Sequence, residues 1–129
     1  MAYRNLREYL DFLQKRELLS VVEDRISKDT ELVPLVRLQF RGLSEADRKA
    51  FWFKNVTDWH GRDFSSSVVL GSLGSSREIY GAALGVDPED IGAKRASTHG
   101  NPIQPAEIPR DSAPVKEFVF EGNNFNEGI

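Results

Sequence analysis

Apolar residues near the start of the chain recur with the spacing of a helix. Leu6, Tyr9, Leu10 and Leu13 fall at positions i, i+3, i+4 and i+7, so a helix would carry all four on one face. An asparagine precedes this run, and a glutamate stands three residues after the asparagine, as in a capping box. The pattern predicts a helix over about residues 5–16.

Stretches rich in β-branched and aromatic residues predict strands. The clearest is 50–56, where aromatic residues alternate between the two faces that a strand would have. Residues 18–22, 66–70 and 115–120 have a similar character, whereas the polar residues 23–29 predict a loop. These stretches predict a small mixed sheet of about four to five strands.

Start and stop signals indicate two further helices. One begins near Thr30, because Pro34 is tolerated only in the first turn of a helix, and it ends at Gly42. The other follows a glycine-rich turn at 71–76 and ends at Gly85. Helices packed on the sheet make the predicted fold class α+β.

Weaker signals organise the rest of the chain. Ser44 can open one short helical turn, and Asp87 followed by Pro88 suits the N-cap and N1 positions of another helical segment. Four prolines then punctuate the chain. We expect an α+β domain over 1–96. We expect 97–129 to be a proline-containing linker and terminal strand that lead toward a further domain missing from this chain.

The composition describes an ordinary globular protein. The chain has 129 residues, of which 40% are hydrophobic and 29% charged, and this suits one domain. A net charge of −3 with scattered basic residues offers no footprint for nucleic acid or for an anionic membrane surface. The absence of cysteine excludes disulfides and thiolate chemistry. No stretch resembles a signal peptide or a membrane span, so we expect a cytoplasmic protein.

The glycine turn at 71–76 lies between a predicted strand and a predicted helix. In that context backbone N–H groups can bind a phosphate. The turn has neither the Lys-Ser/Thr ending of a Walker A loop nor the three-glycine spacing of a dinucleotide site. A tight turn whose helix is capped by Ser75 or Ser76 is therefore the simpler interpretation.

The other candidate chemistry is sparse. His60 and His99 fall in separate predicted loops, and a metal site needs several converging ligands. The carboxylate pairs at 23–24 and 89–90 are adjacent in sequence, so their side chains point apart and suit a solvated surface better than acid–base catalysis. The serine run at 65–67 lacks the context of a nucleophile elbow. No catalytic constellation is visible.

Five short motifs follow one another along nearly the whole chain. They occupy residues 6–18, 53–56, 71–77, 82–86 and 113–117. In type and order they resemble the N-terminal region of the UbiD-like (3-octaprenyl-4-hydroxybenzoate carboxy-lyase-like) decarboxylases. The chain departs from that pattern in lacking a glycine before Glu17 and in the residues that follow Gly122.

The resemblance implies a chemistry that lies outside this chain. Enzymes of that family remove or add a carboxylate on aromatic or α,β-unsaturated acids. They use prenylated FMN with a divalent metal and often potassium. Their catalytic arginine and two glutamates belong to a flavin-binding domain beyond the matched region. The resemblance therefore assigns no catalytic, cofactor-binding or metal-binding residue here.

We expect an accessory N-terminal domain or a separate subunit of such a lyase, inactive alone and oligomeric through a flavin-binding domain or subunit. Arg77, beside the glycine turn, is the residue expected at the interdomain contact. A free-standing protein-interaction module without any role in decarboxylation is the alternative. A small independent enzyme is disfavoured, because the pattern contains no catalytic constellation.

Overall fold

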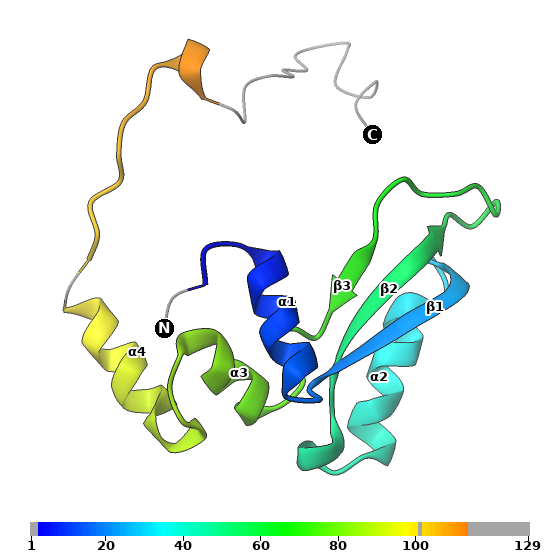
Figure 1. The fold of residues 1–129 in the computed structure, drawn as a ribbon, viewed down its shortest axis with the longest axis horizontal. Coiled ribbons are helices and arrows are strands. Elements are labelled where there is room, and N and C mark those ends of the chain that lie inside the picture. The colour runs from blue at the N-terminus through cyan, green and yellow to red at the C-terminus, as the bar shows by residue number, and fades with distance from the viewer. Residues whose placement is uncertain (1–2, 101, 114–129) are drawn as a thin grey trace.

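The computed structural model describes residues 3–100 and 102–113. Four α-helices and three strands follow one another with short 3-10 turns between them (Figure 1). In chain order the elements are α1 (Leu6–Lys15), β1 (Leu19–Ser27), α2 (Leu32–Gly42), η1 (Glu45–Asp47), β2 (Ala50–Thr57), β3 (Val68–Leu70), α3 (Arg77–Leu84), η2 (Pro88–Asp90), α4 (Ile91–His99) and η3 (Arg110–Ser112).

The three strands form one mixed sheet in the order β1-β2-β3. β1 pairs with β2 in parallel, and β2 pairs with β3 in antiparallel. A tight turn cannot join parallel strands, so the chain crosses from β1 to β2 through α2. Figure 1 shows α1 next to α3, and α2 beyond the strands. The sheet is therefore covered by helices on both faces.

One hydrophobic core, the α1–α3 core, lies between these two helices and the sheet. Strand side chains alternate between faces, and Leu19 and Ala50 point to this one. The ring of Tyr3 packs against those of Tyr9 and Phe12 at its margin. The buried members of the core are Tyr9, Leu10, Leu13, Leu18, Leu19, Ala50, Ile79 and Ala82.

The second core, the α2 core, is smaller and lies on the opposite face. Its buried members are Leu32, Val36, Phe53 and Val56. Phe53 is completely inaccessible to solvent, and its ring stacks on that of Phe51 with 5.8 Å between centroids. Burying a side chain of this size stabilises the fold by roughly 1.5–3 kcal/mol. α2 is thus attached through a narrow stripe of its circumference.

Predicted helix signals are confirmed at several ends. Asn5 caps α1, since its side chain accepts a hydrogen bond from the Glu8 N–H at 3.0 Å. The Glu8 carboxylate reaches back to the Arg4 N–H, one residue earlier than a capping box would place it. Ser76 caps α3, and Gly85 ends that helix with φ of 69°. That left-handed conformation suits glycine.

β1 is longer than predicted, and the loop expected at 23–29 is wrong over most of its length. The strand continues to Ser27 through an irregularity between Val22 and Arg25, where the register with β2 shifts. Pairing resumes with Arg25 opposite Asn55. Polar residues are tolerated here because β1 is an edge strand and the side chains of residues 23–25 are exposed to solvent.

The described residues form three strands, fewer than the predicted total of about four to five. The strand predicted at 66–70 is confined to Val68–Leu70. The strand predicted at 115–120 lies outside the described residues. α4 runs on to His99, whereas residues 102–109 contain neither helix nor strand. The proposed domain boundary between 96 and 97 stays a prediction.

In the described parts of the chain, none of the helices has both the length and the apolar character needed to cross a membrane.

Replacing Leu13 by alanine should destabilise the protein strongly. The side chain has no solvent exposure, so the change leaves a cavity in the α1–α3 core. We expect a loss of about 2–5 kcal/mol in the free energy of unfolding, measured by urea denaturation followed by circular dichroism. Leu6→Ala on the same helix is the matched control, since Leu6 is 55% exposed. Equal losses in the two variants would contradict this picture of the core.

Candidate functional site

At the end of the glycine turn at 71–76, side chains of the protein itself already accept hydrogen bonds from the N–H groups that a phosphate would need. Ser76 Oγ accepts from the Ile79 N–H at 3.2 Å, and Glu45 Oε1 accepts from the Arg77 N–H at 2.8 Å. Gly71 has φ of +73°, and a Cβ there would collide with Ser75 Oγ. A carboxylate already lies at the start of α3, where a phosphate would have to bind. The structure thus favours the tight, capped turn over an anion site.

Buried polar contacts hold this turn against the rest of the fold. The Gln39 side chain donates to Ser75 Oγ at 3.2 Å and accepts from the Lys49 N–H at 2.9 Å. The single proton of the Tyr9 hydroxyl is shared between two acceptors, the Ser72 carbonyl at 2.7 Å and the Ile79 carbonyl at 3.0 Å from the hydroxyl oxygen. Burial raises the pKa of Tyr9 to about 12, so the hydroxyl keeps its proton for these bonds.

Arg77, the residue expected at an interdomain contact, is exposed at the start of α3. Its guanidinium donates to the Pro88 carbonyl at 3.0 Å. This bond ties α3 to η2 within the domain. The interdomain role of Arg77 stays a prediction.

The histidines and carboxylates singled out from the sequence do not converge. His60 lies in the β2–β3 loop and His99 at the end of α4. Within the ranges 3–100 and 102–113 there is no group of three or more histidine, cysteine, aspartate or glutamate side chains suited to a metal. The pair at 23–24 is exposed on β1. Ser67, in the serine run, accepts from the Trp52 indole N–H.

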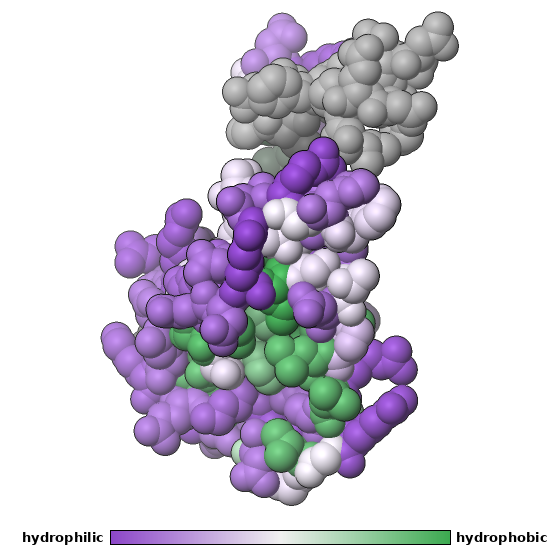
Figure 2. All heavy atoms as spheres, turned by 90° about the vertical axis from the view of Figure 1, so that its right-hand side faces the viewer, coloured by the Kyte–Doolittle hydropathy of each residue, from purple (hydrophilic) through white to green (hydrophobic). Residues whose placement is uncertain are grey.

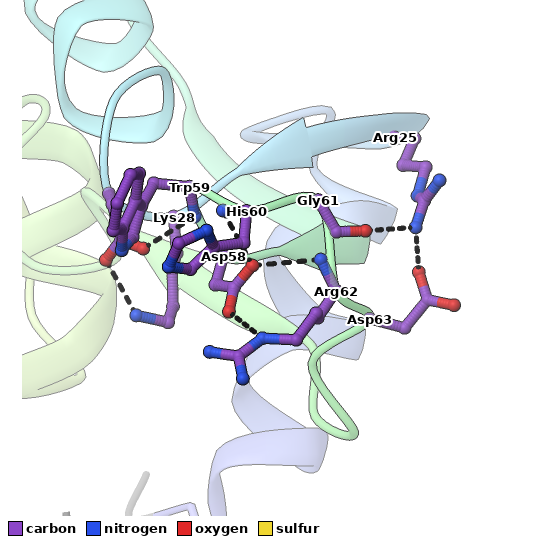
Figure 3. Close-up of polar contacts among 9 residues, drawn as sticks. Arg25, Lys28, Asp58, Trp59, His60, Gly61, Arg62 and Asp63 are labelled. Atoms are coloured by element: carbon purple, nitrogen blue, oxygen red, sulfur yellow. Dashed lines mark hydrogen bonds and ion pairs between the residues drawn. The ribbon is translucent and has the colours of Figure 1, made fainter.

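A second site, which we call the braced loop, is residues 58–63 between β2 and β3 (Figure 3). Asp58 organises it by accepting from the N–H groups of His60 and Arg62, both at 2.9 Å, and from Arg62 Nε at 2.6 Å. The bond from the Arg62 backbone, followed by that from its side chain, holds the pKa of Asp58 below its ordinary value.

Two further contacts tie the braced loop to β1 and to the turn after it. Asp29 accepts from the Trp59 N–H at 3.0 Å and from Lys28 Nζ at 2.7 Å, and the Lys28 bond chiefly lowers the Asp29 pKa. Arg25 donates to the Gly61 carbonyl at 2.7 Å and pairs with Asp63 at 2.6 Å. The loop backbone is therefore held at both ends.

The braced loop presents an aromatic pair to solvent. The Trp59 ring lies 3.6 Å from the His60 ring between centroids, and Trp59 is 68% exposed. From the sequence, this segment is predicted only as the loop that carries His60. An aspartate that bonds the N–H two residues on is an Asx-turn, so Asp58 followed by Gly61 was the available signal. The bonds from Asp29 and Arg25 have no local signature.

A shallow hollow of about 510 Å³ lies beside α1, α3 and η2. Tyr3, Phe12 and Arg16 line it on one side, and Asp87 and Asp90 on the other. The Tyr3 hydroxyl donates to the Ala82 carbonyl, and Arg16 pairs with Glu78 at 3.2 Å. The polar groups on the α1 side are thus already satisfied, and the hollow brings together no nucleophile with a base.

No protein-family model matches the chain, and no curated protein matches it. Among solved structures, the fold is similar to part of the vanillic acid decarboxylase ShVdcCD of Sedimentibacter hydroxybenzoicus, in an open form with truncated ShVdcD. The TM-score is 0.64 and the identity 21%, over 95% of this chain and 26% of that chain. This likeness shows the fold. The chain spans about a quarter of the length of the chain it matches.

Removing the Asp58 carboxylate should loosen the braced loop without unfolding the protein. In Asp58→Ala we expect the amide protons of His60 and Arg62 to exchange several-fold faster, because their acceptor is gone. Amide hydrogen exchange followed by NMR measures this, with Asp11→Ala on the exposed side of α1 as control.

Low pH should weaken the same hydrogen bonds, because protonation removes the negative charge of the Asp58 carboxylate. Because the pKa is lowered in the folded state, the contribution is present above the ordinary value of 3.8 and is lost as pH falls through the lowered pKa. Unchanged exchange in the variant would contradict the bracing.

Proposed function

We propose that this chain is the N-terminal accessory part, or a separate subunit, of a UbiD-like decarboxylase that acts on aromatic or α,β-unsaturated carboxylic acids. The observation that carries the proposal is the fold similarity to vanillic acid decarboxylase, which extends over 95% of this chain and 26% of the other. The order of the five sequence motifs points to the same kind of enzyme. Fold similarity alone leaves function open, so the motifs are needed as well.

The described residues do not fit the cofactor of such an enzyme. A flavin phosphate needs free N–H groups, and the start of α3 is already bonded by Ser76 and Glu45. A divalent metal needs converging carboxylates, and the described residues contain no such group. Prenylated FMN, its metal and potassium would therefore be held by the flavin-binding domain or subunit. This chain would contribute a rigid body that packs against it.

The purified chain should be colourless and should release no CO₂ from aromatic acids. A tagged pull-down from the source cells, with intact mass and a visible spectrum, is expected to recover a larger partner with flavin-like absorption. The assembled complex should then decarboxylate. Stoichiometric flavin binding by the chain alone would overturn the proposal, and a colourless partner would favour a free-standing interaction module.

Arg77 offers a test of the predicted domain contact. If its guanidinium lies at the interface, Arg77→Ala should weaken association with the flavin-binding partner about fivefold, the effect expected for one lost hydrogen bond. Analytical ultracentrifugation or calorimetry of the complex measures this. Since Arg77 also bonds the Pro88 carbonyl, Glu89→Ala on the same turn serves as control for disturbance of η2. Unchanged assembly in Arg77→Ala would remove the residue from the interface.

A further inference from the structure

The outward surface of α2 has an unusual composition for a helix exposed to solvent. Only three of its residues, Leu32, Val36 and Gln39, are buried. Val33 is 52% exposed and Leu38 60%, although both are large and apolar. The helix contains no acidic residue and no lysine. The centre of a protein–protein interface is more apolar than the rest of the surface, is enriched in arginine and is depleted in lysine and glutamate.

Two arginines on this surface have no partner in the described part of the chain. Arg37 and Arg41 are one helical turn apart, so their side chains share a face. The ion pairs among residues 3–100 and 102–113 involve other residues. The nearby Phe40 is engaged differently, because the guanidinium of Arg48 lies over its ring. Arg37 and Arg41 therefore present positive charge without any compensating carboxylate.

The shape of this surface matches a helix. Pro34 and Leu38 form one i, i+4 row and Arg37 and Arg41 form the next, and together they line a hollow of about 230 Å³. Grooves between such rows are what the side-chain ridges of a second helix fill when two helices pack. Figure 2 shows hydrophobic side chains gathered between hydrophilic ones on the side of the molecule that includes α2.

We propose that the outer face of α2, formed by Pro34, Arg37, Leu38 and Arg41, binds an amphipathic helix of a protein partner. The partner helix carries an apolar seam flanked by aspartate or glutamate. The seam packs on Pro34 and Leu38, and the flanking carboxylates pair with the two arginines, as charge complementarity requires. This inference does not depend on the proposed decarboxylase role, because it follows from the surface of α2 alone.

The test is an NMR titration of the ¹⁵N-labelled full chain with two synthetic helical peptides. The peptides share one leucine seam and differ only in their flanking residues, which are all glutamate in one and all lysine in the other. The glutamate peptide should shift the amide signals of 32–43 saturably, and the lysine peptide should bind at least about tenfold more weakly. Arg37→Glu with Arg41→Glu should reverse this preference. Leu38→Ala should weaken binding of both peptides.

The control is Lys94→Glu with Arg95→Glu, which makes the same change in net charge on exposed positions of α4 and should leave both affinities unchanged. The dispersion of the amide spectrum reports whether each variant is folded. Shifts outside α2, or equal binding of the two peptides, would overturn the proposal. If the chain self-associates and Arg37→Glu with Arg41→Glu abolishes this association, the occupant of the face is a second copy of this chain and the proposed partner helix is wrong. Co-sedimentation with phosphatidylserine vesicles, lost in the same variant, would replace it by a membrane surface.

Discussion

The parallel pairing of β1 with β2 is the constraint on which the rest of the fold depends. Parallel neighbours require a crossover, and α2 supplies it on one face of the sheet. α1 and α3 are then left to cover the opposite face, where they form the α1–α3 core. Because successive strand residues alternate in direction, Val21 packs in one core and Val22 in the other. Each core contains residues of both β1 and β2, so neither core is complete without this pairing.

Polar contacts between residues far apart in the sequence then hold α1, α2 and the glycine turn against the paired strands. Gln39 on α2 joins the start of β2 to the glycine turn, and Tyr9 on α1 bonds the same turn from the other face. Both side chains are buried, so each lost bond would leave an unsatisfied polar group that costs about 1–3 kcal/mol. The glycine turn at 71–76, which in sequence lies where a phosphate loop could lie, therefore has a structural role: it connects α1 and α2.

Sequence reasoning succeeded where the physics is local. The cap at Asn5, the cap at Ser76 and the stop at Gly85 follow from the chemistry of single residues. It failed where the cause lies far along the chain. Polar residues of β1 are strand because Asn55 and its neighbours pair with them, and the braced loop depends on Asp29, 30 residues before Trp59. The predicted interdomain contact of Arg77 would be made to residues outside this chain, so it stays a prediction.

The energetics of α2 explain why its outer face bears on binding and not on folding. An 11-residue helix is marginal by itself and is stabilised mainly by the face it packs. In α2 three buried residues provide that packing. Leu38 is not part of the α2 core, so a polar residue at this position would leave the stability of the fold nearly unchanged. Exposing it brings no gain in stability. Burial against another surface would give a leucine between two unpaired arginines a physical rationale that the fold itself does not supply. Leu38 and Trp59 both lie outside the two cores, so neither side chain is needed to complete them.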